Sequence, residues 1–232
     1  NINNIKGDFY GDKISYFNNK KEFINNVSVS FSNHNNENTI ILDSEIGNGT
    51  FTYNFDYKDL YPKINNIFSS YLQDEKIDYS GDDFFDFNLV LEDASFFTSL
   101  FYTDLDLGKV VISSDYNLDN NYILNANISD VLIDQYYLNN FKLQLSGLDE
   151  KLDCNIFLNQ LINKNSTLLD TLHFSINSNK GNLEYNLNWL YNDSLLYNGS
   201  LAGEYIFKNE YNELIFKNSK FYLADKLWNI SK

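Results

Sequence analysis

The sequence has no methionine, one proline and one cysteine, and none of its apolar runs approaches the ~20 residues that span a bilayer. The single cysteine, Cys154, cannot form an intramolecular disulfide, so a small disulfide-stapled scaffold is excluded. Cys154 alternates with Leu152, Ile156 and Leu158, which predicts a thiol buried on one face of a strand. Because neither an initiator methionine nor a signal peptide is present, we expect the chain to be a segment of a longer protein.

Signatures of catalysis are also lacking. The sequence contains no glycine-rich phosphate loop, no nucleophile-elbow motif and no recognisable Ser/His/Asp order. Its two histidines, His34 and His173, have no neighbours at metal-ligand spacing, so no zinc site is predicted. We therefore expect neither enzyme activity nor a metal or cofactor, although a glycosidase could draw its two carboxylates from the 32 acidic residues.

Two acidic stretches, YSGDDFFDF at 79–87 and TDLDLG at 103–108, invite comparison with calcium-binding loops. The second stretch lacks the glycine and the closing glutamate that a helix–loop–helix calcium site requires. We interpret both groups of carboxylates as solvated loop residues.

Positive charge is scarce. The chain has 17 Lys and Arg residues against 32 Asp and Glu residues, which gives a formal net charge of −15. This field repels both a nucleic-acid backbone and anionic lipid headgroups. We therefore expect no nucleic-acid partner and no peripheral role on a membrane surface.

Apolar residues alternate with polar ones along most of the chain, which is the pattern of half-buried β-strands. The stretch GNLEYNLNWLYND at 181–193 is typical. The same pattern occurs at Val27–Phe31, Phe51–Tyr57, Phe87–Leu91, Tyr122–Ile128, Phe141–Leu145, Leu152–Leu158, Leu172–Ile176, Leu201–Phe207, Leu214–Phe216 and Phe221–Leu223.

Short Asn- and Gly-bearing segments such as NHNNEN and SNKGN separate these strands. Connections this short favour hairpins over parallel crossovers, so the pattern predicts an antiparallel meander. Helical spacing replaces alternation in LYPKINNIFSSYL, which predicts a helix over Leu60–Leu72 with Pro62 in its first turn. A second, short helix is predicted around Phe96, Phe97, Leu100 and Phe101.

The apolar faces of these strands could form the core of a β-sandwich or the floor of an open trough. A sandwich usually has Pro and Gly at its corners and long Greek-key connections, whereas this chain has one Pro and 10 Gly and is connected by hairpins. The sequence therefore favours a mostly β fold: an elongated antiparallel curved sheet, of the β-taco or groove type, with one or two short helices. A dozen strands at ~4.8 Å spacing would extend for roughly 55–60 Å.

We predict that apolar residues along the strands share the concave face, while Asn186 and Asn188 face water. The residues predicted to line this face are Phe51, Tyr53, Phe55, Leu124, Leu143, Ile156, Phe174, Leu183, Tyr185, Leu187, Trp189, Tyr205, Phe221 and Leu223.

Three segments resemble TamB-like proteins of the AsmA-like superfamily of bacterial envelope proteins. The C-terminal stretch NELIFKNSKFYLADKLWNIS matches their F-x-L-x-x-x-x-W-x-I strand pair, through Phe221, Leu223, Trp228 and Ile230. The segment DFNLVLEDASFFTSLFYTDLDLGKVVISSDYN is similar to the strand–helix–loop–strand element of the Bacteroidetes versions, and LSGLDEKLDCNIFL suits their repetitive sheet. No stretch resembles the family's N-terminal membrane anchor or its extreme C-terminal domain.

The resemblance implies that residues 1–232 form one continuous β-groove segment of a longer periplasmic protein, anchored in the inner membrane. It implies that the groove carries phospholipid acyl chains between the inner and outer membranes, with a role in outer-membrane biogenesis. It further implies an outer-membrane assembly protein as a partner, through regions outside this chain. The alternatives are a non-enzymatic β-sandwich module of a surface or adhesin protein, and a carbohydrate-active β-protein with a carboxylate pair in a cleft.

Overall fold

The computed structural model contains one extensive β-sheet and one long helix. It describes residues 4–18, 20–72, 82–95, 98, 105–117, 121–148, 151–163, 166–179, 182–191, 194–208, 211–223 and 226–231. Within these ranges only the backbone is described for residues 4–5, 12–25, 57, 64, 67–68, 70–72, 194–197 and 223.

Within the described residues, eighteen strands, the short helical turn η1 and the helix α1 follow one another, and Ser95 and Thr98 are also helical. The elements are β1 (Asn4–Asn18), β2 (Lys20–His34), β3 (Glu37–Ser44), β4 (Gly47–Tyr53), η1 (Tyr57–Asp59), α1 (Leu60–Leu72), β5 (Phe85–Leu91), β6 (Leu105–Leu107), β7 (Val110–Tyr116), β8 (Tyr122–Ile133), β9 (Tyr136–Leu148), β10 (Lys151–Leu158), β11 (Gln160–Asn163), β12 (Ser166–Leu169), β13 (Thr171–Asn179), β14 (Asn182–Tyr191), β15 (Ser194–Phe207), β16 (Asn212–Phe216), β17 (Ser219–Leu223) and β18 (Lys226–Ile230).

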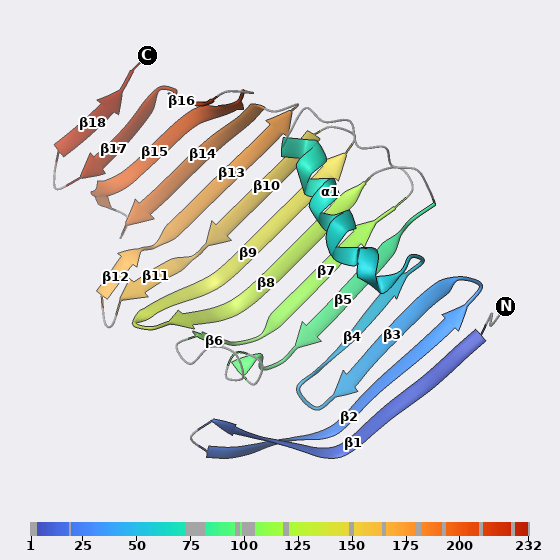
Figure 1. Ribbon diagram of the computed structural model, residues 1–232. Coiled ribbons are helices and arrows are strands. Elements are labelled where there is room, and N and C mark those ends of the chain that lie inside the picture. Colours follow the sequence, from blue (N-terminus) through green and yellow to red (C-terminus); the bar gives the residue numbers. More distant parts are fainter. Residues whose placement is uncertain are drawn as a thin grey trace.

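Every strand pairing is antiparallel, and the sheet is a meander, as the short connections predict. Strands β1 to β5 pair in chain order, followed by β7, β8, β9, β10, β13, β14, β15, β17 and β18. The short strands β6, β11 and β16 pair with the outer parts of β8, β9 and β15, and β12 pairs with β11. The edge strands β1 and β18 lie at opposite ends of the sheet, so the sheet does not close (Figure 1).

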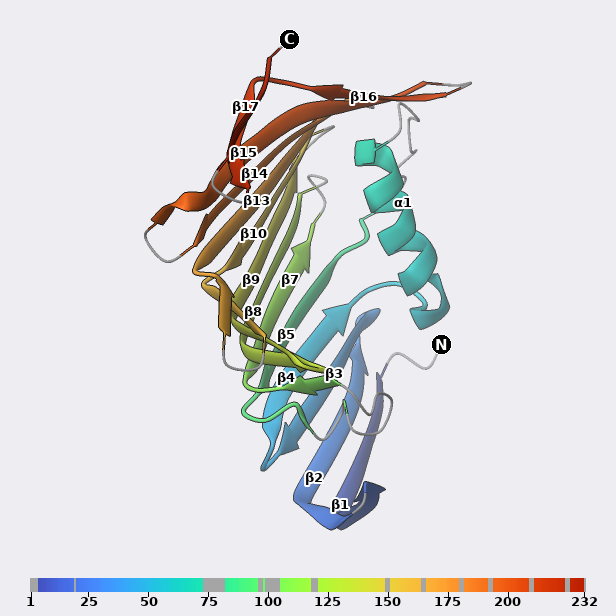
Figure 2. The same cartoon turned by 90° about the vertical axis from the view of Figure 1, so that its left-hand side faces the viewer.

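The sheet is curved, and α1 lies on its concave side (Figure 2). Figure 1 shows α1 passing over the strands from β4 to β13 near one end of each strand. The predicted elongated, curved antiparallel sheet is therefore the architecture of the chain. The facing-sheet architecture of a β-sandwich is not present in the described residues.

Turn and helix predictions agree with the structure in most places. The β2–β3 hairpin turns at Asn35 and Asn36, which both have positive φ (52° and 67°), as a two-residue hairpin turn requires. The helix α1 has the predicted bounds, Leu60–Leu72. Most of the second predicted helix, including Phe96, Phe97, Leu100 and Phe101, lies outside the described residues.

The strand predicted over Phe51–Tyr57 is shorter than expected, because β4 ends at Tyr53. At Asp56 the chain changes direction: the Asp56 side chain accepts a hydrogen bond from the Lys58 backbone N–H (3.0 Å), and its carbonyl accepts one from the Asp59 N–H (2.8 Å). These local bonds favour the turn η1 over a continued strand.

Candidate functional site: the concave apolar face

The register of the strand pairings arranges side chains in rows that run across the sheet, because directly opposed residues share a face. Four such rows lie on the concave face. On β10 their members are Leu152 (row 1), Cys154 (row 2), Ile156 (row 3) and Leu158 (row 4).

Row 3 is apolar in all twelve strands that it crosses between β1 and β15. Its members are Phe9, Val29, Leu42, Gly49, Leu89, Ile112, Ala126, Leu143, Ile156, Phe174, Leu187 and Leu201.

The flanking rows are mostly apolar, and none of the residues assigned to them is charged. Their polar members are Ser178 in row 1 and Ser114 in row 2, and row 1 becomes polar beyond Tyr53, at Asn38 and Asn33. Row 1 contains Tyr53, Phe85, Tyr116, Tyr122, Gly147, Leu152, Ser178, Leu183, Tyr205 and Leu214. Row 2 contains Phe31, Ile40, Phe51, Phe87, Ser114, Leu124, Leu145, Cys154, Ile176, Tyr185, Gly203 and Phe216. Row 4 contains Leu91, Val110, Ile128, Phe141, Leu158, Leu172, Trp189, Gly199, Phe221 and Trp228.

The convex face carries the charges that the concave face lacks. Glu184 and Glu204 are directly opposed on β14 and β15, which places two like charges side by side. The Lys217 ammonium lies between them, with its Nζ 2.6 Å from Glu204 and 3.2 Å from Glu184. These hydrogen bonds, to Glu204 first and Glu184 second, raise the pKa of Lys217. The two faces of the sheet are therefore chemically opposite.

A second pair of like charges lies on the convex face, and no lysine or arginine in the described part of the chain forms an ion pair with either member. Asp86 and Asp115 are directly opposed on β5 and β7. Burial, and secondly the charge of Asp86, raise the pKa of Asp115. Because the folded state holds the Asp115 proton more tightly than the unfolded chain does, ionised Asp115 destabilises the fold at neutral pH. This penalty disappears as the pH falls through the pKa of Asp115.

We expect Asp115→Asn to raise the melting temperature at pH 7, with a gain that shrinks to nothing in acid. Thermal unfolding followed by circular dichroism between pH 7 and about pH 3, below the ordinary aspartate pKa, measures it. Asp153→Asn is the matched control, because Asp153 lies on the same face of β10 opposite Ser146 and Asn177. A gain for Asp115→Asn that is equal at every pH would contradict the assigned cause.

The largest buried cluster lies between α1 and the sheet. Its most buried members are aromatic, led by Phe85 and Tyr122 at 4% exposure each, and Leu60 of α1 packs against it. The Tyr53 hydroxyl has a raised pKa, chiefly through burial and secondly through the charge of Asp56. This cluster is thus confined to one side of the sheet and to one end of its strands.

Two glycines in β15 allow large side chains of β14 to lie across the sheet. A Cβ atom at Gly203 would come within 2.2 Å of the Tyr185 hydroxyl and 2.4 Å of the Ile215 carbonyl oxygen. A Cβ at Gly199 would come within 2.4 Å of the Trp189 indole. The Tyr185 hydroxyl is buried without a hydrogen-bond partner, and burial raises its pKa. The rings of Tyr185 and Trp189 therefore lie over β15 and add to the apolar surface of the concave face.

The structure brings together nearly all the residues predicted from the sequence to line the concave face. Twelve of them are members of rows 1 to 4, and Phe55 packs in the cluster beneath α1. Tyr53 and Phe55 are buried there, at 5% and 9% exposure, whereas Asn186 and Asn188 face water as predicted. The side chain of Leu223 lies outside the described residues.

Sequence reasoning did not select several residues of row 3, including Leu42, Leu89 and Ile112. Alternation is enough to place Leu89 on the apolar face of its strand. Ile112, in contrast, lies in the run VVI, which does not alternate, so the sequence does not assign it to a face. The alignment of these side chains across strands follows from register, which the sequence pattern does not specify.

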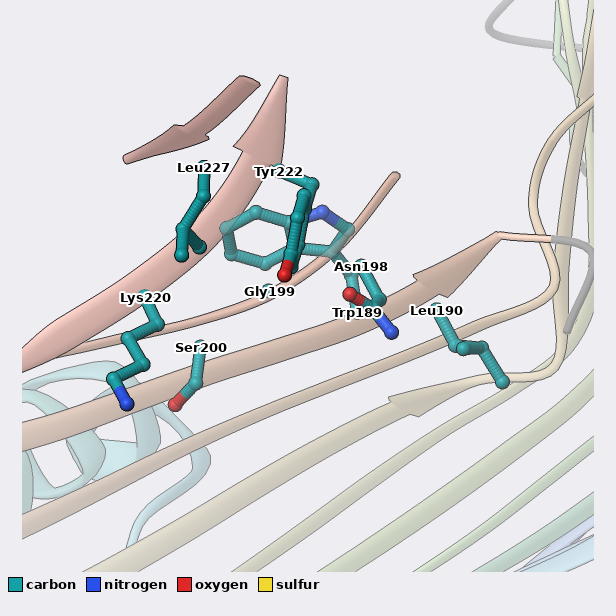
Figure 3. A pocket seen from close by; sticks show the side chains of 8 residues that line it. All are labelled: Trp189, Leu190, Asn198, Gly199, Ser200, Lys220, Tyr222 and Leu227. Carbon is teal, nitrogen blue, oxygen red and sulfur yellow. The ribbon is translucent and has the colours of Figure 1, made fainter. Parts of the chain in front are cut away.

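An open hollow of ≈ 420 Å³ lies beside the C-terminal strands (Figure 3). Trp189, Tyr222 and Leu227 give it apolar surface, and Lys220 and Ser200 add polar groups. Asn198, Gly199 and Leu190 complete its lining. No carboxylate, cysteine or histidine is among these residues, and the lining combines apolar surface with a few polar groups, as a binding site does.

Two of the residues considered for metal binding, Asp83 and His173, have other partners. Asp83 forms an ion pair with Lys63, and His173 stacks on Phe157 with ring centroids 4.2 Å apart. Asp104 lies outside the described residues. In the described part of the chain, no three His, Cys, Asp or Glu side chains are grouped as metal ligands would be.

The 13-residue α1 is too short to cross a bilayer, and no other helix in the described ranges is long and apolar enough to do so. No protein-family model, no curated protein and no solved structure matches the chain.

Proposed function

We propose that the concave face binds phospholipid acyl chains, as a segment of a periplasmic envelope protein that carries them between the inner and outer membranes. The observation that carries this proposal is row 3, an apolar row that crosses twelve strands without a charged or polar member. Contiguous apolar surface of this extent is rare on the outside of a soluble monomer and is typical of a contact surface.

The dimensions suit an acyl chain. Twelve strands at about 4.8 Å spacing make a row about 50 Å long. An acyl chain spans about 15 Å, half of a ~30 Å hydrocarbon core, so the row accommodates about three chain lengths. Each CH₂ group removed from water on this surface contributes about 0.8 kcal/mol. Because neighbouring positions along the row are chemically alike, a chain can slide between them without a large barrier.

The polar convex face supports the same function, because it keeps a sheet with an apolar floor hydrated between two membranes. The TamB-like sequence segments add the biological setting. In that setting the full-length protein is anchored in the inner membrane, contributes to outer-membrane biogenesis and contacts an outer-membrane assembly protein through regions outside this chain. The proposed role is one of binding and not of catalysis.

The alternatives receive less support. An adhesin-type sandwich would cover the apolar rows with a second sheet, whereas the described strands form a single open sheet. A carbohydrate-active protein would place a pair of carboxylates in a cleft. Asp86 and Asp115 are opposed on the convex face and line an open hollow of ≈ 250 Å³. Its other lining residues, Ser113, Ser114 and Ile123, include no aromatic ring on which a sugar could stack.

Native mass spectrometry of the chain purified from a bacterial periplasm tests the proposal. We expect bound phospholipid that survives gentle desolvation and is lost on extraction with organic solvent. A protein of 27.1 kDa without any lipid adduct, from preparations that were never exposed to detergent, would contradict an acyl-chain site.

A further inference from the structure

Row 1 is buried in one part of the sheet and accessible in another. Its members from β4 to β13 are buried, for example Tyr53, Phe85 and Leu152 at 4–5% exposure. Further along the same row, Leu183 and Tyr205 are half-buried and Leu214 is 53% exposed. The change coincides with the far end of α1, which passes over the strands from β4 to β13 (Figures 1 and 2).

The helix is attached to the sheet at its first turns. Leu60 packs against the buried cluster, and the Lys63 ammonium pairs with Asp83 and lies 5.2 Å from the centre of the Phe55 ring. Thirteen residues give α1 a length of about 20 Å, whereas the twelve strands that row 3 crosses extend for about 50 Å. The helix therefore covers only the middle of the sheet.

Row 4 is covered at the opposite end of the middle strands. Leu91 and Val110 are buried at 6% and 4% exposure, in contact with Ala94 at 2%. The Ala94 backbone N–H donates to the Gly108 carbonyl oxygen at 3.2 Å, which holds this connection against the sheet. On β5 and β7, α1 thus covers one end of the concave face, and residues 92–95, here called the Ala94 segment, cover the other end.

Row 3 lies between these two covers and is the one row of the four with no buried member among the described side chains. On β5, the covered residues Phe85 and Leu91 are six residues apart, about 20 Å along the strand. Only Phe87 and Leu89 of the concave face lie between them, so the uncovered strip here is one or two side chains wide.

We infer, on the basis of the proposed function, that acyl chains lie along row 3 and its border with row 2, and that α1 excludes them from row 1. The helix and the Ala94 segment narrow the path to a single file of chains across β5 to β8. From β14 onward α1 no longer covers row 1, and the path widens over Leu183, Tyr205 and Leu214. The apolar floor is therefore divided into a permanent core and a binding strip.

The smallest member of row 3 in the narrow part, apart from glycine, is Ala126 on β8. A tryptophan at this position would stand across the strip and leave the cluster beneath α1 untouched. The adjacent residue Asn125 points to the convex face and provides a matched control. Each buried CH₂ accounts for about a fourfold change in affinity, so displacing two of them in Ala126→Trp weakens binding at least about tenfold.

Thiol labelling of two positions on one strand tests which part of the floor is used. In a Cys154→Ser background, Ile156→Cys samples row 3 and Leu152→Cys samples row 1, on the same face of β10. Maleimide labelling rates are measured with and without palmitoyl lysophosphatidylcholine as free monomers. We expect fast labelling at position 156 that the lipid suppresses, and slow labelling at position 152 that the lipid does not change.

The other outcomes distinguish a failure of the exclusion by α1 from a failure of the proposed acyl-chain binding. Fast labelling at both positions, suppressed by lipid at both, would overturn the exclusion by α1 and leave the proposed function standing. Lipid without effect at either position would overturn the proposed function and the binding strip with it. Equal loss of lysophospholipid affinity in Ala126→Trp and Asn125→Trp would likewise overturn the assignment of row 3.

Discussion

Replacing Leu187 with aspartate is expected to leave the chain folded and to abolish its crosslinking to phospholipid. Leu187 is half-buried in row 3 on β14, beyond the part of the concave face that α1 covers. A carboxylate there remains in contact with water, so the fold does not bear the cost of an unpaired buried charge. An acyl chain passing over the same position would have to strip water from that carboxylate.

Crosslinking in cells measures the effect. The photoreactive residue p-benzoylphenylalanine is placed at Tyr185 or Tyr205, and phospholipids are labelled with radioactive phosphate before irradiation. Labelled adducts are expected at both positions in the parent chain and at neither in Leu187→Asp. Leu143→Asp, in the same row on β9, should behave in the same way and should weaken the outer-membrane barrier in the full-length protein.

Leu152→Asp is the matched control, because Leu152 is 5% exposed in the cluster beneath α1. Large-to-small changes at buried leucines cost about 2–5 kcal/mol even without the added charge. This variant is therefore expected to unfold or to be degraded. If Leu187→Asp were degraded in the same manner, or if its lipid adducts persisted, row 3 would be ordinary core and the acyl-chain proposal would fail.

Replacing Gly203 with alanine is expected to destabilise the fold by about 1–3 kcal/mol, the usual cost of forcing an extra methyl group into a packed site. The new Cβ would meet the Tyr185 hydroxyl at 2.2 Å and the Ile215 carbonyl oxygen at 2.4 Å. The tyrosine can move, but the carbonyl belongs to the backbone of β16, which must shift away from β15.

Gly7→Ala provides the comparison, since Gly7 is opposed to Phe31 of row 2 at the other end of the sheet and a Cβ there meets nothing within 4 Å. Urea unfolding of both variants measures the difference in the free energy of unfolding. A double variant, Gly203→Ala with Tyr185→Leu, should recover only part of the loss, because the contact with Ile215 remains. Equal stability of the two glycine variants would show that Tyr185 does not depend on the space above Gly203.

The sequence by itself determined the elements and their faces. Alternation in β14 predicts that Leu183, Leu187 and Trp189 share a face while Asn186 and Asn188 contact water, and the structure agrees. The helical spacing between Leu60 and Leu72 predicts α1 with its observed bounds. These features were predictable because they depend on the period of side chains along one segment, which a single strand or helix already specifies.

Only the tertiary structure decided how the faces combine. Each strand of the chain would fit a closed sandwich as well as an open sheet, because both bury one face and hydrate the other. The alignment of Leu89, Ile112 and Ala126 in one row depends on register between strands, which is fixed by contacts across the sheet. The path of α1 likewise places Tyr53 and Phe55 in the core while Leu187 stays accessible, although all three have the same pattern in the sequence. Burial is a property of what packs above a residue, and the elements that pack above β4 to β13 come from elsewhere in the chain.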